Sequence, residues 1–416
     1  MNRIILIGNG FDLAHGLKTS YADFIEWYWE EWGKRLRSDI DKLVEDNFCS
    51  FQLNNSVPAA GWYLVWPYYV QMNPARPWTN KEIVDIAKQH KDLCAFISKS
   101  KFFEKICEHL QTKKWVDIED VFYDFLKKSL VPKLINDDLE FIKEKLIEYL
   151  NTLMEPTLNS IIRNQIFAPI SKEDIAIGSM DKWKEMMLNR LEYSKNDWED
   201  LLAGYYTNIG EFRAVESTIE HFKHEIENGV RSNDFDDEYI EKICPAYKLP
   251  DKIMLLNFNY TNTADLYLPD VYRFSVNHIH GSLSNPKSVI FGYGDEHDDE
   301  YQPLMKKNDN EYLRHIKSFR YLESSNYRKM LEFIELGPYQ VCIMGHSCGI
   351  SDRTLLKTLF EHKNCVSIKP YYYRDKDGKD NYFDLICNIA RSISDPRLMR
   401  DRVVRKERCQ PLGGKA

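Results

Sequence analysis

The sequence lacks several features that would assign it to a specialised class of protein. No segment is apolar for long enough to span a bilayer, and the N-terminus has no apolar stretch of signal-peptide length. No C-x-x-C pair occurs, so neither a zinc ribbon nor a thioredoxin-type site is indicated, and we predict no metal site. There is no internal repeat. With nine scattered cysteines, the chain fits a globular protein with reduced thiols, and we expect it in the cytoplasm.

An excess of positive charge is also missing. The net charge is −8, so the molecule as a whole is not built to wrap nucleic acid. Basic residues gather only near the C-terminus, at Arg397, Arg400, Arg402, Arg405, Lys406 and Arg408. This run favours a solvated terminal helix, and a contact with nucleic acid or an acidic partner is the alternative.

What the chain does have is enough length and apolar content for a large core. It has 416 residues, of which 43% are hydrophobic and 13% aromatic. Short apolar runs in residues 3–8 and after Pro250 read as strands, and helical segments alternate with the later ones. The strands are predicted in KIMLLNF, YRFSVNHIHG, SVIFGYG, YQVCIMG and CVSIKPYYY. This alternation predicts a parallel α/β sheet that also includes the first strand.

The middle of the chain has a different character. Residues 47–78 lack periodicity and read as an irregular loop, whereas 80–239 show apolar residues at helical spacing. We therefore predict an α/β core formed by residues 1–46 and 245–416. Residues 47–244 would be the loop followed by a large helical insertion over one end of the sheet. Glu119 and Asp120 begin one of these helices, where acidic residues usually satisfy first-turn amides, and they are also candidate site residues.

Residues that suggest ligand binding follow the first strand. Gly8 and Gly10 end it, and a loop at the carboxyl end of a parallel strand is where α/β proteins bind ligands. Glycine there lets backbone amides approach a phosphate. The dinucleotide fingerprint G-x-G-x-x-G is broken, because Leu13 stands at its third glycine. The alternative is that the glycines serve turn geometry alone.

Two further strand ends carry polar residues. NFNYTN at 257–262 offers the Asn259 amide, and HIHGS at 278–282 offers His280, which titrates near neutral pH. Because the carboxyl ends of parallel strands meet at one edge, we expect both near the glycine loop. A His-Gly pair at a strand end is also common as a purely structural feature.

A competing motif lies at 345–349. GHSCG fits the G-x-S-x-G nucleophile elbow of α/β-hydrolases, between a predicted strand and a helix. The only later histidine, His362, is on the helix directly after Ser347, too early for the usual order of serine, acid and histidine. The alternative use is a second glycine-rich strand end, with Gly345, His346 and Ser347 facing the same ligand.

Six blocks of this sequence resemble the AbiH family, bacterial abortive-infection proteins of phage defence. The resemblance runs nearly end to end and is carried by GNGFDLAHGLKTSYADF, the W-x-D-I-E stretch at Trp115, NFNYTN, HIHGSL, FGYG and MGHSCGISD. The chain also resembles the sirtuin-like NAD-binding group, which includes defence NADases. That resemblance implies a doubly wound parallel sheet of sirtuin-like topology.

The sirtuin-like resemblance also implies roles for individual residues. Gly8 and Gly10 would approach the NAD phosphates, Asn259 would be the functional amide, and His280 would be the general base. The loop from Gly345 to Ser347 would contact the adenosine side. There are departures from the group's pattern. Thr261 replaces an Asp, Asn9 replaces a small Ala, and the zinc cysteines of sirtuins are missing, so protein deacylation is not expected.

Together these observations predict a phage-defence protein that binds NAD and hydrolyses it to nicotinamide and ADP-ribose. Asn259 and His280 are the predicted catalytic residues. The predicted NAD-binding residues are Gly8, Asn9, Gly10, Asp12, His15, Thr261, Gly345, His346 and Ser347. Asp12 is equally suited to capping the following helix. The alternatives are a nucleotide sensor without turnover, a nucleic-acid-interacting protein and an esterase acting through Ser347. A phage-derived trigger and a second copy of the chain are the expected partners, with no membrane.

Overall fold

A computed structural model describes residues 1–38, 43–53, 80–89, 94–113, 117–191, 193, 195–202, 248–269 and 273–414. Trp115 and the predicted helix in VESTIEHFKHEIEN lie outside these residues, as does most of the predicted irregular loop.

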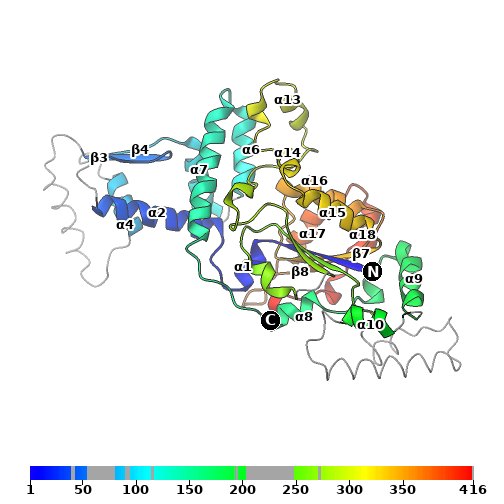
Figure 1. Cartoon of the computed structure of the whole chain (residues 1–416). Coiled ribbons are helices and arrows are strands. Elements are labelled where there is room, and N and C mark those ends of the chain that lie inside the picture. The colour runs from blue at the N-terminus through cyan, green and yellow to red at the C-terminus, as the bar shows by residue number, and fades with distance from the viewer. Residues whose placement is uncertain are drawn as a thin grey trace.

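The central element is a parallel sheet of five strands in the order β6-β5-β1-β7-β8 (Figure 1). Its strands are β1 (Asn2–Ile7), β5 (Ile253–Asn257), β6 (Phe274–His278), β7 (Tyr339–Met344) and β8 (Cys365–Tyr371). Ile5 of β1 lies opposite Leu255 of β5 and Cys342 of β7, so β1 is the middle strand. The prediction that the first strand joins the C-terminal strands is confirmed.

Helices cover both faces of this sheet. Ile4 and Leu6 point to one face, where they pack with residues of α15 (Asn326–Glu335), α16 (Arg353–Glu361) and α17 (Tyr382–Arg391). Ile5 and Ile7 point to the other, against α1 (Asn9–Ala14), α8 (Ser160–Ile166) and the short helix η4 (Thr263–Tyr267). This is a mixed α/β fold with a doubly wound sheet, and the direction of strand succession reverses between β1 and β7.

A second body of helices stands beside the sheet (Figure 1). The apolar faces of α2 (Tyr21–Ser38), α5 (Lys101–Lys113), α6 (Ile118–Lys128) and α7 (Pro132–Leu150) form one core with apolar side chains from 291–316. We call these four helices the helical block. The helix α8 lies outside it, because Ile162 and Ile166 are buried against the sheet. The insertion therefore supplies α5, α6 and α7 of the block, which α2 completes from residues 1–46, and its α8 covers part of one sheet face.

Two sequence-based assignments differ from the structure. Within the predicted irregular loop, Cys49–Leu53 forms β3, which pairs antiparallel with β2 (Val44–Glu45) and β4 (Cys94–Ser98). SVIFGYG was predicted as a strand but contributes only an isolated bridge between Tyr293 and Ile316. Its apolar residues are buried by linking the sheet to the helical block, which does not require a strand ladder.

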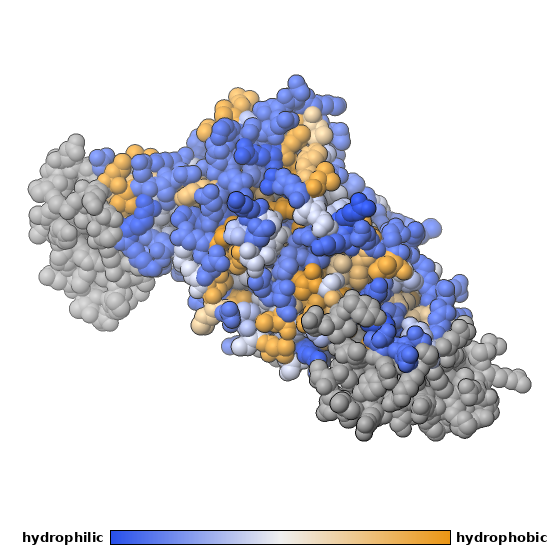
Figure 2. Space-filling view, in the orientation of Figure 1, coloured by the Kyte–Doolittle hydropathy of each residue, from blue (hydrophilic) through white to orange (hydrophobic). Residues whose placement is uncertain are grey.

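The remaining elements connect these parts. The α-helices are α4 (Asn80–Gln89), α9 (Met180–Leu191), α10 (Lys195–Leu202), α13 (Tyr301–Met305), α14 (Lys317–Arg320) and α18 (Pro396–Arg402). The short 3-10 helices are η1 (Lys172–Asp174), η2 (Ile177–Ser179), η5 (Pro286–Ser288), η6 (Asn310–Tyr312), η7 (Tyr321–Glu323), η8 (Ile350–Asp352), η9 (Lys406–Arg408) and η10 (Leu412–Gly414). No helix among the described residues is long and apolar enough to cross a membrane, and the face shown in Figure 2 is largely hydrophilic.

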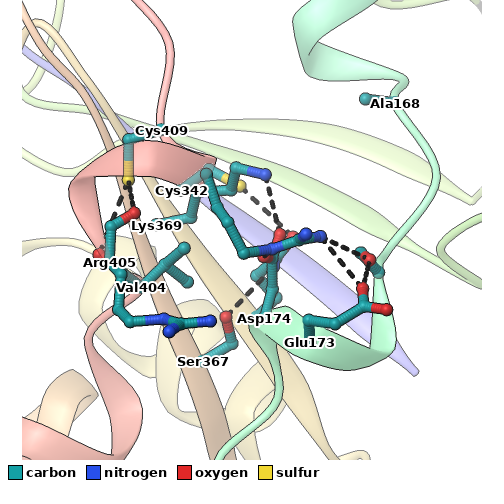
Figure 3. Close-up of polar contacts among 12 residues, drawn as sticks. Ala168, Glu173, Asp174, Cys342, Ser367, Lys369, Val404, Arg405 and Cys409 are labelled. Atoms are coloured by element: carbon teal, nitrogen blue, oxygen red, sulfur yellow. Dashed lines mark hydrogen bonds and ion pairs between the residues drawn. The ribbon is translucent and has the colours of Figure 1, made fainter.

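Only part of the basic C-terminal run lies on a solvated helix. Arg397 and Arg400 are exposed on α18, whereas Arg402 is buried and Arg405, Lys406 and Arg408 follow the helix. After α18 the chain follows the outer edge of the sheet, where Val404 N–H donates to Ile368 O at 2.9 Å. Arg408 and Lys369 both pair with the buried Asp174, each at 2.7 Å (Figure 3). We call residues 403–414 the C-terminal strap. It covers the β8 edge, which would otherwise be open to pairing with another chain.

Candidate functional site

The two glycine loops pack directly on each other at the carboxyl edge of the sheet. Gly10 N–H donates to Gly345 O at 2.8 Å, and Gly8 N–H donates to Met344 O at 3.3 Å. A Cβ at Gly8 would lie 2.4 Å from His346 Cα. Glycine is therefore required here for close contact between the loops after β1 and β7. The predicted pyrophosphate contacts stay a prediction, and in this structure both amides are engaged by protein carbonyls.

Asn259 and Thr261 attach the loop after β5 to the loop after β1. Asn259 Nδ2 donates to Gly8 O at 3.0 Å, and Thr261 Oγ1 donates to Asp12 Oδ2 at 2.7 Å. Asp12 is buried, and burial raises the pKa of its carboxyl, although the hydrogen bond from Thr261 opposes the shift. Its Oδ1 has no hydrogen-bond partner among the described residues. Thr261, which stands where the sirtuin-like pattern has an Asp, thus donates a hydrogen bond to a buried carboxylate.

Three other predicted site residues, His15, Asn9 and Ser347, make separate contacts. His15 is held on the far side of α1, where Nδ1 lies 2.7 Å from Phe11 O and Nε2 contacts Tyr267 OH. Asn9 is exposed and accepts a hydrogen bond from the Thr19 hydroxyl. Ser347 is exposed, and its carbonyl accepts from Asn388.

The esterase alternative gains no triad from this geometry. His362, the one histidine that follows Ser347, has its Nε2 3.1 Å from Glu335 Oε1 on α15. That ring therefore contacts a carboxyl of another helix.

The most strongly buried charges at this edge surround Lys317. Its Nζ lies 2.8 Å from Glu119 Oε2 and 2.8 Å from Asp352 Oδ1, and these side chains are 1%, 10% and 10% exposed. Asp352 in turn faces two rings, with Oδ1 3.3 Å from His280 Nε2 and Oδ2 3.5 Å from His346 Nε2. We call these five residues the buried charge cluster.

Each member of the cluster is positioned by the local fold. Glu119 is in the first turn of α6, whose N-cap Asp117 accepts hydrogen bonds from the backbone amides of Glu119 and Asp120. Lys317 begins α14, and Asp352 ends η8 just before α16. His280 follows β6.

Burial and pairing shift the acidity of these groups in different directions. Burial alone would raise the pKa of Asp352, but Lys317 and then His280 hold it well below its usual range. Burial, helped by Lys317 and opposed by Asp352, lowers the pKa of His280. Burial raises the pKa of Glu119 to about 7, against the pull of Lys317. His280 is therefore kept neutral at neutral pH, with a carboxylate fixed against its ring.

The cluster unites sequence blocks that lie far apart in the chain. Glu119 comes from the W-x-D-I-E block, and its Oε1 accepts the Gly292 N–H of FGYG at 3.1 Å. His280 comes from HIHGSL, and His346 and Asp352 come from MGHSCGISD. Lys317, which links them, lies in no block and was missed, because only the fold brings residues 119 and 352 to it.

Asp120 is the other acidic candidate of α6. Burial, with Asp117 and Glu119 nearby, raises its pKa to about 8. Among the described residues, no group of three or more His, Cys, Asp or Glu side chains is arranged to hold a metal ion.

Comparisons with known proteins place the chain in a family. No curated protein and no solved structure matches it. The family model described as "Bacteriophage abortive infection AbiH" matches residues 4–373, which include residues 4–7 of β1, the other four strands of the sheet and the whole buried charge cluster. The chain belongs to the AbiH family.

Proposed function

We propose that this chain acts in phage defence by binding NAD at the carboxyl edge of the sheet and hydrolysing the bond between nicotinamide and ribose. Membership of the AbiH family suggests the role in abortive infection. The observation that carries the catalytic part is the pairing of His280 with Asp352, beside the loop that presents Asn259. The proposal includes a sirtuin-like topology, and a parallel sheet with helices on both faces agrees with it.

In this proposal His280 is the general base. Its Nε2 faces Asp352 Oδ1 and, at 3.1 Å, Tyr321 OH. The other ring nitrogen, Nδ1, is then the one that accepts a proton from the attacking water. The lowered pKa of His280 keeps the ring unprotonated for this step. Water adds to the ribose carbon as nicotinamide leaves, and the water proton passes to the imidazole.

Asn259 holds the reacting sugar. Its Nδ2 is used by Gly8 O, which fixes the side chain and directs its Oδ1 as an acceptor for a ribose hydroxyl or the water. The NAD pyrophosphate would reach the Gly8 and Gly10 amides only after the end of β7 and the loop that follows it move away, because Met344 O and Gly345 O accept from them. We therefore propose that the present arrangement is the inactive one.

The test is incubation of the purified chain with NAD, alone and with lysate from phage-infected cells, followed by chromatography for nicotinamide and ADP-ribose. His280→Asn and Asn259→Ala should each reduce release at least ~100-fold. His362→Asn is the matched control, because it removes a half-buried histidine that contacts Glu335 outside the buried charge cluster, and it should retain wild-type release. Absence of nicotinamide in both conditions would exclude NAD hydrolysis.

A nucleotide sensor is the second candidate, favoured by Thr261, which stands where the sirtuin-like pattern has an Asp and whose hydroxyl donates to the buried Asp12. A sensor would bind NAD, raise the melting temperature and return the dinucleotide intact. A nucleic-acid-interacting role finds less support, because Arg402 is buried and Arg408 is paired with Asp174 in the C-terminal strap.

A further inference from the structure

We propose that Lys317 is a positioning residue of this site, and that its bond to Glu119 makes the helical block a determinant of how Asp352 orients His280 and His346. This inference deepens the proposed function and depends on it for the role of His280 as base. It assigns a role to a lysine outside every recognisable sequence block and to the contact between the helical block and the sheet edge.

The geometry of Asp352 carries the first step. Its two carboxylate oxygens face different rings, with Oδ1 toward His280 and Oδ2 toward His346. A carboxylate that serves two rings needs its rotation fixed, and Lys317 Nζ at 2.8 Å from Oδ1 supplies that restraint. The ring of Phe258 limits the imidazoles further, with centroids 5.1 Å from His280 and 4.1 Å from His346.

The charge balance carries the second step. With Lys317 absent, Glu119 and Asp352 would be two buried carboxylates near one another, and one of them would take up a proton. Lys317 keeps Asp352 ionised and able to accept from His280, and it opposes the burial that raises the pKa of Glu119 to about 7. The other titratable groups that face the cluster include Asp117 and Asp120 at the start of α6, Cys348 after β7, Tyr21 on α2, Tyr260 after β5 and Tyr321 on η7.

Glu119 carries the link to the helical block. It is the one member of the buried charge cluster contributed by the block, in the first turn of α6. Its second oxygen accepts the Gly292 amide, so the carboxylate is held from both sides. Movement of α6 would take Glu119 from Lys317 and change the field at Asp352 and its two histidines.

The experiment measures the protonation of His280 by NMR of its ring, with the signal assigned from its absence in His280→Asn. At pH 6.5 Lys317→Met should raise the protonated fraction, with the titration midpoint moved up by about 1 pH unit, because Asp352 then pairs with His280 alone. Lys317→Arg should stay at the wild-type midpoint. Glu119→Gln, in which a neutral amide replaces a carboxyl whose pKa is about 7, should not raise the fraction.

A rise of the His280 midpoint in Lys317→Met but not in Glu119→Gln separates positioning from a general loss of stability. A loss of packing would change the midpoint in both variants in the same direction. If Lys317→Met does not fold, the double variant Lys317→Met/Glu119→Gln, which removes the buried pair together, is measured instead and should show the same upward shift. An unchanged midpoint in the folded variant, or a rise in Glu119→Gln, would overturn the inference.

The pH profile of NAD hydrolysis provides the second readout. If His280 is the base, the acidic limb of the pH profile should move with the NMR midpoint of His280 in Lys317→Met. If the wild type releases no nicotinamide, the proposed function fails, while the His280 titration still decides whether Lys317 positions Asp352.

Discussion

At the scale of single residues, Gly345 shows how closely the candidate site is built. Its φ is +79°, and an added Cβ would lie 2.0 Å from Phe11 N. Both the backbone conformation and the space exclude a side chain, because the loops after β1 and β7 contact each other through their backbones.

We predict that Gly345→Ala lowers the free energy of unfolding by at least about 2 kcal/mol, measured by urea denaturation. Gly378 is a matched control, with φ +81° and open space around its Cβ position. Gly378→Ala pays only the backbone cost, about 1 kcal/mol. Equal losses in the two variants would show that the loop contact contributes nothing.

The sequence made some of these residues predictable. Asn259 and His280 stand out because polar residues directly follow apolar strands, and parallel strands bring such ends together. Lys317 does not follow an apolar strand, so no such pattern indicates it. Its importance comes from a carboxylate about 200 residues earlier and another 35 residues later, and only folding places all three within hydrogen-bond distance.

At the scale of elements, the C-terminal strap illustrates how a basic run can be structural. Arg408 is 31% exposed and pairs with Asp174, which is 2% exposed, whereas Arg405 is 73% exposed and pairs with the exposed Glu407. The Arg408–Asp174 pair shields a buried charge, whereas the Arg405–Glu407 pair is exposed to water.

Arg408→Ala should therefore lower the free energy of unfolding by about 2 kcal/mol, because Asp174 keeps only Lys369 as a cationic partner. Arg405→Ala should change it by less than ~0.5 kcal/mol. Thermal and urea unfolding of the two variants check this. A large loss in Arg405→Ala would contradict the distinction between them.

The five strands of the sheet could be predicted from their apolar sequences. Strands of a parallel sheet are buried on both faces, and β1, β5 and β7 each appear as a continuous apolar run. SVIFGYG is just as apolar but is buried by the helical block, so composition alone could not separate it from a strand. The short strand β3 escaped prediction because a five-residue run, CSFQL, gives little periodicity.

At the scale of the whole molecule, buried neutral histidines make the fold sensitive to acid. His315 lies between the helical block and the sheet edge, with Nε2 3.6 Å from Glu140 Oε1 on α7. Burial, opposed by Glu140, lowers its pKa to about 4. The folded protein thus binds fewer protons than the unfolded chain at pH values between about 4 and 6.5, so stability is lost as the pH falls through this window.

We expect His315 to remove about 2 kcal/mol of stability between pH 8 and pH 5, from the difference between its folded and unfolded pKa. Urea denaturation of the wild type and His315→Gln across this range measures it. The variant should show a shallower pH dependence, and parallel curves would contradict the prediction. His362→Gln is the control, since His362 is half-buried beside the exposed Glu335 and away from His315 in the fold.

The position of β1 has a consequence for synthesis in the cell. β1 is the middle strand, yet its neighbours begin at Ile253 and Tyr339. At translation rates of ~5–20 residues per second, the strand waits roughly 15 to 70 s for its second neighbour to be made. During that time the apolar run of residues 4–7 in β1 is exposed on the nascent chain, so we expect chaperone capture of N-terminal fragments on the ribosome to limit the yield of this protein.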